Sequence, residues 1–134
     1  MANGTIAFDT LSTSGQISGT AKSVDTDYLA YGSAKAWANY TSATTTAYRD
    51  SFNFGSITDN GTGDTTHTFT NAMSNNDYSV VSSASAAETG TGSLGGSQHP
   101  RTFATASFSH VTATSAGSLA DRPHVNNEVL GVLA

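Results

Sequence analysis

The sequence predicts an all-β protein: an antiparallel β-sandwich, jelly-roll-like, with an extended N-terminal arm. Three observations predict this class. Apolar and polar residues alternate with a period of two in many short stretches, which is the pattern of strands. No segment keeps helical periodicity for ten residues. Turn-forming residues recur at roughly 10–15-residue spacing, which is typical of antiparallel sandwiches and barrels.

The composition indicates a folded chain that associates with itself. Hydrophobic residues make up 37% and charged residues 11% of the 134 positions, while Thr and Ser supply 21 and 19. Threonine and aromatic residues favour strands, so low charge here does not indicate disorder. Subunit interfaces are depleted in Lys, Glu and Asp, so we expect an oligomer. A monomer with a Thr/Ser-rich surface is the alternative.

Charge and residue content also exclude several classes of function. The net charge is −5 with only five Lys and Arg, so no basic stripe exists to neutralise nucleic-acid phosphates. The sequence contains no run of 18 apolar residues, so it predicts no membrane-spanning segment. The first residues also lack the pattern of a signal peptide. Without cysteine, neither disulfides nor thiolate metal sites are possible.

Alternation predicts strands along the whole chain. The alternating stretches are residues 5–11, 23–31 (around an Asp-Thr-Asp bend), 34–40, 47–54, 65–69, 78–83, 101–115 and 125–133. The residues expected to share faces are Ile6 with Phe8; Ala36 and Ala38 with Tyr40; Tyr48 and Phe52 with Phe54; Thr65 and His67 with Phe69; Tyr78 with Val80; and Ala104 and Ala106 with Phe108. We expect residues 1–33 to form the arm and the first strands, and residues 34–134 to form the sandwich domain.

Two segments predict turns or loops. Residues 59–64 read DNGTGD between two alternating stretches. Asn60-Gly61 favours a two-residue hairpin turn because both residues accept positive φ, and a longer turn with Gly63 as a bulge fits equally well. Residues 87–100 are predicted to form a loop by their composition. Its glycine-rich part, residues 90–96, is the candidate for variable recognition because it is long and unconstrained.

The histidines and acidic residues invite a metal or catalytic interpretation. The four histidines lack the close spacing of metal ligands, so we expect hydrogen-bonded or interface histidines, with a histidine at a threefold axis as the alternative. Asp59 and Asp64 could hold Ca²⁺, but side chains folding back on the turn are commoner. Carboxylates are few, most Asp lie beside turns, and no G-x-S-x-G motif occurs. We therefore expect no catalysis, no cofactor and no metal.

Aromatic residues supply the remaining candidates for a binding site. Trp37, Tyr40, Tyr28 and Tyr31 could form a platform for glycan, whereas packing in the core and the subunit interface is the commoner role. The residues singled out as candidates for ligand or interface contacts are Trp37, Tyr40, His67, Ser93, Leu94 and His99.

A run of motifs in residues 34–81 carries a resemblance. These motifs are AKAW (34–37), RDSFN (49–53), SITDNGTGD (56–64), TFTNAM (68–73) and NNDYSVV (75–81). The run resembles a segment common in tail-fibre and related virion proteins of tailed bacteriophages, and GTIAFDTLSTSGQI (4–17) resembles openings of small marine-phage proteins. The resemblance implies a β-rich, usually homotrimeric structural subunit. His67 stands where that pattern has a bulky apolar residue, so we expect the position not to be fully dry.

The leading hypothesis is a non-enzymatic virion structural protein on the phage particle surface. It would be a homotrimeric subunit of a short tail fibre or surface appendage, with other virion proteins as partners and host surface glycan as a further contact. The arm would reach a neighbour or the particle, and residues 87–100 would face outward. A capsid decoration (cement) protein and a carbohydrate-binding module are the alternatives.

Overall fold

The computed structural model describes residues 15–18, 23–85 and 96–134, and these form an antiparallel β-sandwich. The predicted all-β sandwich is therefore confirmed. The elements are β1 (Gln16–Ser18), β2 (Ser23–Asp25), α1 (Thr26–Gly32), β3 (Ala34–Thr41), β4 (Ala47–Phe52), β5 (Phe54–Gly61), β6 (Asp64–Phe69), β7 (Ser79–Ser85), β8 (Gln98–Arg101), β9 (Ser107–Thr112) and β10 (His124–Leu130).

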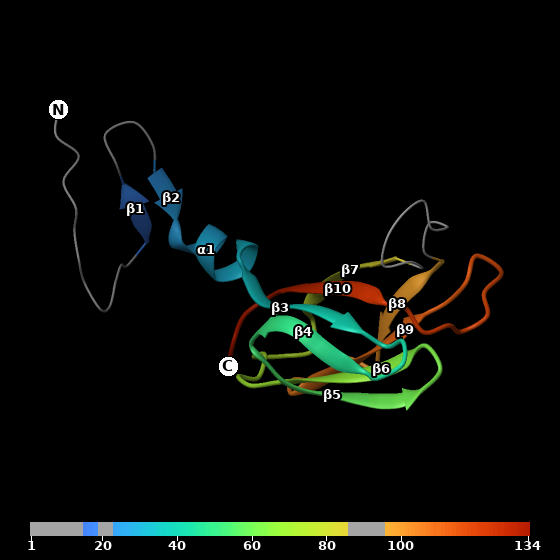
Figure 1. The fold of residues 1–134 in the computed structure, drawn as a ribbon. Helices are drawn as coiled ribbons and strands as arrows, with labels where there is room; N and C mark the ends of the chain where they lie inside the picture. Colours follow the sequence, from blue (N-terminus) through green and yellow to red (C-terminus); the bar gives the residue numbers. More distant parts are fainter. Residues whose placement is uncertain (1–14, 19–22, 86–95) are drawn as a thin grey trace, which may run out of the picture.

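Two four-stranded sheets form the body of the molecule (Figure 1). The strand orders are β4-β3-β10-β7 and β5-β6-β9-β8, and every pairing is antiparallel. Strands β3, β6, β9 and β10 each bury every second residue, so their apolar sides face one another between the sheets. The central core cluster is Ala36, Ala38, Phe54, Phe69, Met73, Tyr78, Phe108 and Val129.

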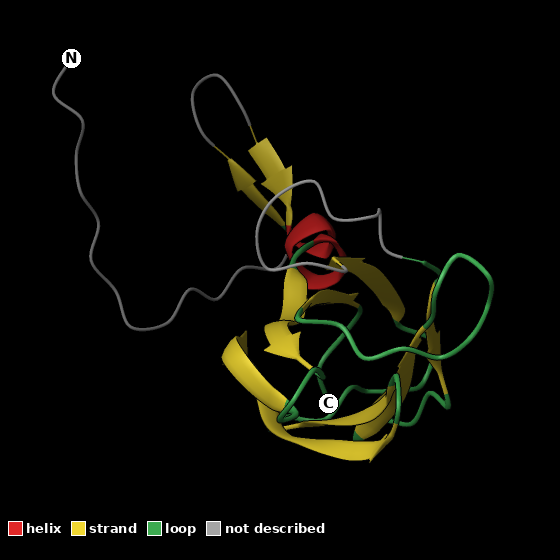
Figure 2. Cartoon of the chain, turned by 45° about the vertical axis from the view of Figure 1, so that its right-hand side comes forward, coloured by secondary structure: helices red, strands yellow, loops and turns green. Residues whose placement is uncertain are grey.

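The N-terminal elements lie outside the two sheets. β1 pairs with β2, and α1 leads from this ribbon to the start of β3. Figure 1 shows these elements to one side of the sandwich, and Figure 2 again shows the β1–β2 ribbon outside it. The prediction of a strand bending within residues 23–31 was wrong for its second half. The side chain of Asp25 accepts a hydrogen bond from the backbone N–H of Asp27 (3.0 Å) and caps a helix instead.

The predicted inward face of β3 is confirmed, whereas that of β4 changes halfway. Tyr48 pairs with Tyr40, but the register shifts by one residue beyond this pair, so Phe52 comes to lie opposite Trp37. A β-bulge of this kind reverses which side chains face the core. The prediction that Phe52 shares a face with Tyr48 and Phe54 was therefore wrong, and 53% of Phe52 is exposed.

A sharp corner separates β4 from β5, where the sequence predicted one continuous strand. Asn53 adopts a φ of 59°, which asparagine tolerates better than most residues. Its side-chain amide donates to the carbonyls of Lys35 (3.0 Å) and Asn71 (3.1 Å) and accepts from the N–H of Asn71 (2.7 Å). These bonds hold the corner at which the chain passes from one sheet to the other.

The predicted hairpin joins β5 and β6, with its turn further along than Asn60-Gly61. Gly61 pairs with Asp64 around Thr62-Gly63, and the register shift between Asp59 and Gly61 makes Asn60 the irregular position. Gly63 has a φ of 65° and lies against the backbone carbonyl of Thr112, so glycine is required there.

Residues 98–115 differ from the prediction in two ways. β8 (Gln98–Arg101) begins within the expected loop, which was predicted to end at residue 100. Its Pro100 is tolerated because β8 is an edge strand. The expected strand over residues 101–115 begins only at Ser107, because Thr102 has a φ of 51° and a turn closes between Ala104 and Ser107. Phe108 is buried as predicted, but Ala104 and Ala106 are exposed.

Other predictions have simpler outcomes. The prediction that Tyr78 and Val80 share a face is confirmed, and this face points toward the core. The predicted final strand is also present and runs from His124 to Leu130. The strand expected at residues 5–11 and most of the loop expected at residues 87–100 lie outside the described residues. Among the helices of the described chain, none has the length and apolar character needed to cross a membrane.

Candidate binding surface

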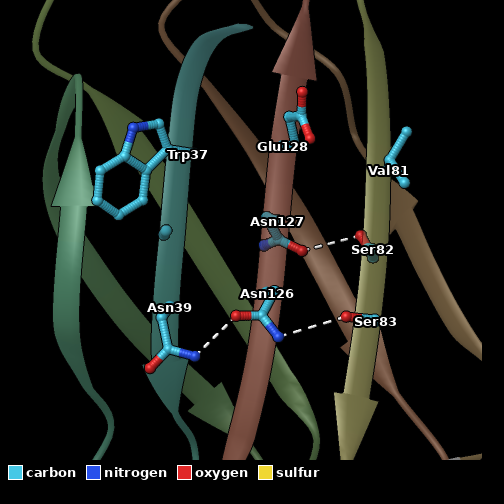
Figure 3. A pocket seen from close by; sticks show the side chains of 9 residues that line it. Trp37, Asn39, Val81, Ser82, Ser83, Asn126, Asn127 and Glu128 are labelled. Atoms are coloured by element: carbon cyan, nitrogen blue, oxygen red, sulfur yellow. Dashed lines mark hydrogen bonds between the residues drawn. The ribbon is translucent and has the colours of Figure 1, made fainter.

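The outward face of the β4-β3-β10-β7 sheet carries a shallow groove of about 330 Å³. Because side chains alternate along a strand, β3 presents Trp37 and Asn39 here, and β10 presents Asn126 and Glu128 (Figure 3). β7, the strand next to β10 in this sheet, completes the groove with Val81 and Ser83.

Register arranges these outward side chains in two rows across the sheet. One row contains Phe52, Trp37, Glu128 and Val81, in successive strands. The neighbouring row contains Asp50, Asn39, Asn126 and Ser83. The first row is largely apolar and the second is polar, so the face has two distinct chemical halves.

Hydrogen bonds hold the polar row in place. The side-chain N–H of Asn39 donates to Oδ1 of Asn126 (2.7 Å), and Nδ2 of Asn126 donates to Oγ of Ser83 (3.3 Å). On the inward side of the same two strands, the hydroxyl of Ser82 donates to Oδ1 of the buried Asn127 (2.8 Å). Figure 3 shows all three hydrogen bonds. The amide groups are therefore oriented before any ligand arrives.

Much of the apolar row is open to solvent. Trp37 is 40% and Val81 58% exposed, and they flank the groove on opposite sides in Figure 3. Between them, Glu128 forms no hydrogen bond or ion pair with any residue that the structure describes. The surface thus combines an exposed indole, a row of amides and an unpaired carboxylate.

Two of the residues singled out as candidates for ligand or interface contacts do not lie on this surface. Tyr40 and His67 are 1% and 0% exposed and lie between the sheets, so the expectation that His67 is not fully dry was wrong. Burial there is tolerated because hydroxyl groups of other core residues satisfy the ring nitrogens. The four aromatics therefore do not form the glycan platform considered as an alternative: Tyr40 is in the core, and Tyr28 and Tyr31 are exposed on α1.

The hydrogen bonds of His67 determine its tautomer. The hydroxyl of Tyr48 donates to the carbonyl of Ser56 (3.0 Å), so it accepts a bond from Nδ1 of His67 (3.0 Å). With its proton on Nδ1, His67 accepts at Nε2 from the hydroxyl of Thr65 (3.1 Å). Asn127 lies at 3.5 Å from the same nitrogen. The Thr65 hydroxyl also lies 3.4 Å from the carbonyl oxygen of His110, which is a longer contact than its bond to Nε2 of His67.

The chain of hydrogen bonds continues to a second buried histidine. Because the Thr65 hydroxyl donates to His67, it accepts from the hydroxyl of Tyr40 (3.3 Å), and Tyr40 accepts from Nδ1 of His110 (2.8 Å). Nε2 of His110 has no partner. In this arrangement the unpaired atom is an acceptor and not a donor, so neither of these two histidines leaves a ring N–H without a partner among the described residues.

Burial keeps both core histidines neutral. It lowers the pKa of His67 to about 3, with a smaller contribution from the charge of His110. Burial likewise lowers the pKa of His110 to about 4, with a contribution from His99. The same desolvation raises the pKa values of Tyr40 and Tyr48, so their hydroxyls stay protonated.

The remaining candidates do not join this surface or the core network. His99 is exposed on β8 in the other sheet, whereas Ser93 and Leu94 lie outside the described residues. Asp59 accepts from Thr46 Oγ1 (2.8 Å) and from the N–H of Gly61 (2.9 Å); the Thr46 bond is the larger cause of its lowered pKa.

Asp64 is also engaged, in an ion pair with Arg101. Asp59 therefore folds back on the turn backbone through the N–H of Gly61, as the commoner interpretation predicted. Asp64 bonds instead to the side chains of Arg101 and Asn60. Within residues 15–18, 23–85 and 96–134, no three His, Cys, Asp or Glu side chains gather as metal ligands would.

Sequence reasoning found one half of the groove and missed the other. The alternation of residues 34–40 predicted that Trp37 and Asn39 share a face. Asn126 and Glu128 were missed because they lie almost ninety residues further along, and only strand pairing brings them beside β3. Their outward position in an alternating C-terminal strand was the available signal.

Comparisons of the chain with protein-family models, curated proteins and solved structures found no match. Functional arguments for this protein therefore depend on its own residues and geometry.

Proposed function

We propose that the chain is a non-enzymatic structural subunit that assembles with copies of itself, as a homotrimer, on the surface of a bacteriophage particle. Within the particle, it forms a short tail fibre or another surface appendage. Assembly is its mechanism: subunits pack through the N-terminal arm, and the sandwich supplies a rigid body.

The observation that carries this proposal is the exposed apolar surface of α1. Tyr28, Leu29 and Tyr31 are 76%, 48% and 62% exposed, and no residue of this helix is buried. A seven-residue helix is not stable in isolation, because most helical stability in proteins comes from packing an apolar face. A neighbouring subunit would supply the surface against which this helix packs.

Two further features support assembly on a virion. The chain has 11% charged residues, and oligomer interfaces are depleted in charge. The motifs of residues 34–81 resemble those of tail-fibre and related virion proteins, and in the structure they form β3 to β6 and the start of β7. The segment that carries the resemblance thus supplies strands to both sheets of the sandwich.

The oligomeric state of purified protein tests the proposal. We expect light scattering after size exclusion to give a mass about three times 13.7 kDa. Replacing Tyr28, Leu29 and Tyr31 together by serine should yield monomers with an unchanged circular dichroism spectrum. Leu119→Ser is the matched control, because Leu119 is 50% exposed but lies in a loop of the sandwich. A monomeric wild-type chain, or a trimeric triple variant, would refute assembly through α1.

Its place on the particle requires a separate experiment. Gold-labelled antibody against the chain should decorate the tail or other appendages of intact particles in electron micrographs. Label over the capsid lattice would instead identify a decoration protein, and particles without any label would reject the virion proposal.

A further inference from the structure

The groove beside Trp37 has the chemistry of a sugar-binding site. We propose that it binds a neutral pyranose residue of a glycan, with the indole of Trp37 as the stacking surface and the Asn39–Asn126–Ser83 row as the hydrogen-bonding surface. This inference goes beyond assembly through α1, which involves a different part of the chain.

The dimensions of the groove suit a sugar ring. Trp37 on β3 and Val81 on β7 are separated by β10, so they lie two strand spacings apart, or about 10 Å. The volume of about 330 Å³ lies at the small end of the range for small-molecule sites. A groove of this size holds roughly one or two pyranose rings.

Its two chemical halves match the two sides of a pyranose. The C–H groups on one face of such a ring form an apolar patch that packs on an aromatic side chain, and Trp37 is 40% exposed at the groove. The hydroxyls at the ring edge both donate and accept hydrogen bonds. Asn39 and Asn126 each retain one free N–H and free acceptor capacity after forming their mutual bond.

Preorganisation favours binding over a merely polar surface. Because the bonds among Asn39, Asn126 and Ser83 fix the amides, a ligand need not order them, which reduces the entropic cost of association. The hydroxyl of Ser83 accepts from Asn126 and keeps its own hydrogen for a ligand.

Charge indicates which sugars fit. Glu128 lies in the row beside Trp37 without a partner among the described residues, and none of the described lining residues is Lys or Arg. A carboxylate accepts hydrogen bonds from sugar hydroxyls but repels sialic acids, uronic acids and phosphorylated sugars. The ligand is therefore neutral.

The single tryptophan of the chain gives a direct assay, because its fluorescence reports only on this groove. The probes are lactose, maltose, cellobiose and N,N′-diacetylchitobiose, with sialyllactose as the acidic comparison. We expect at least one neutral disaccharide to give a saturable blue shift, with a Kd near or below about 1 mM. Sialyllactose should bind at least about tenfold more weakly than lactose if lactose is the ligand.

Variants distinguish this site from other surfaces. Asn126→Ala keeps the fluorescent reporter and should weaken binding about tenfold by removing the centre of the amide row. Trp37→Ala, measured by titration calorimetry, should remove detectable binding, while Trp37→Phe should retain part of it. Tyr31→Ala is the matched control, because it removes an exposed aromatic on α1 and should leave the affinity unchanged.

Three results would overturn the proposal. These are the absence of a saturable response to every neutral disaccharide, unchanged affinity in Asn126→Ala and Trp37→Ala, and tighter binding of sialyllactose than of lactose. Oligomer mass is measured on the same samples. A trimer that binds no sugar would contradict this inference alone, and a sugar-binding monomer would contradict only the proposed assembly.

Discussion

Lowering the pH from 7.5 to 5 should destabilise the folded chain through its two buried histidines. In the folded chain the pKa values are about 3 for His67 and about 4 for His110, and both return to the ordinary value of 6.5 on unfolding. At pH values between the folded and unfolded pKa values, the two histidines therefore bind protons in the unfolded chain but not in the folded chain. The histidine contribution to stability is complete above pH 6.5 and is lost as the pH falls toward the folded pKa values.

The size of the effect follows from this difference in proton binding. Each pH unit below 6.5 costs about 1.4 kcal/mol per histidine while the folded form stays neutral. At pH 5 this amounts to about 2 kcal/mol for His67 and a similar value for His110, so about 4 kcal/mol in all. That is a large part of the 5–15 kcal/mol typical of domains. Stopping at pH 5 keeps ordinary carboxylates ionised.

Urea unfolding followed by far-UV circular dichroism, at one fixed protein concentration, measures the loss at the two pH values. His67→Gln keeps an amide that can accept from Thr65, and it should halve the difference in unfolding free energy between pH 7.5 and 5. His99→Gln is the matched control: it removes an exposed histidine on β8 and should keep nearly the full difference. Equal wild-type stability at both pH values would refute the reasoning, as would a full wild-type difference in His67→Gln.

Three substitutions test other features of the fold by thermal or urea unfolding. Gly63→Ala should cost at least about 2 kcal/mol, because the added Cβ would clash with the backbone carbonyl of Thr112. Gly117→Ala is the control: Gly117 has a similar positive φ but lies in open space, so the loss of stability should be smaller. Equal losses in the two variants would contradict the steric argument. Phe108→Ala should cost about 3–5 kcal/mol, since this side chain is fully buried between the sheets, and a loss below 1 kcal/mol would show that the core collapses around it. Asn53→Ala should cost about 2–4 kcal/mol by removing the bonds and the favourable φ of the β4–β5 corner, and a neutral result would show that the corner holds without them.

Local alternation was enough to identify the class of fold and many core residues. On β3 and β6 the pattern predicted the buried faces correctly, because each strand has one side in the core and one in solvent. Where a strand continued through a bulge or a corner, the pattern failed. The bulge in β4 and the positive φ of Asn53 each change the alternation without a break in composition, so Phe52 was placed on the wrong side.

The candidate site was predicted only in part, for a related reason. Alternation within β3 placed Trp37 on the face opposite Ala36 and Tyr40, whereas the packing of the two sheets made that face the outward one. What lies beside Trp37 depends on β10, which joins β3 only through long-range pairing. The complete burial of His67 depends likewise on the hydroxyl groups of Tyr48 and Thr65. The alternation of residues along the sequence does not place these hydroxyls near its ring nitrogens.

The amino-acid sequence was therefore sufficient to predict a β-sandwich, its turns in outline and the alternation that separates Trp37 from Tyr40 on the same strand. Only the tertiary structure decided the amide row beside that tryptophan, the buried histidine network and the exposed helix of the arm. The physical reason is that a strand's face follows from neighbouring residues, whereas the partner across a sheet or a core is set by register between strands distant in the chain.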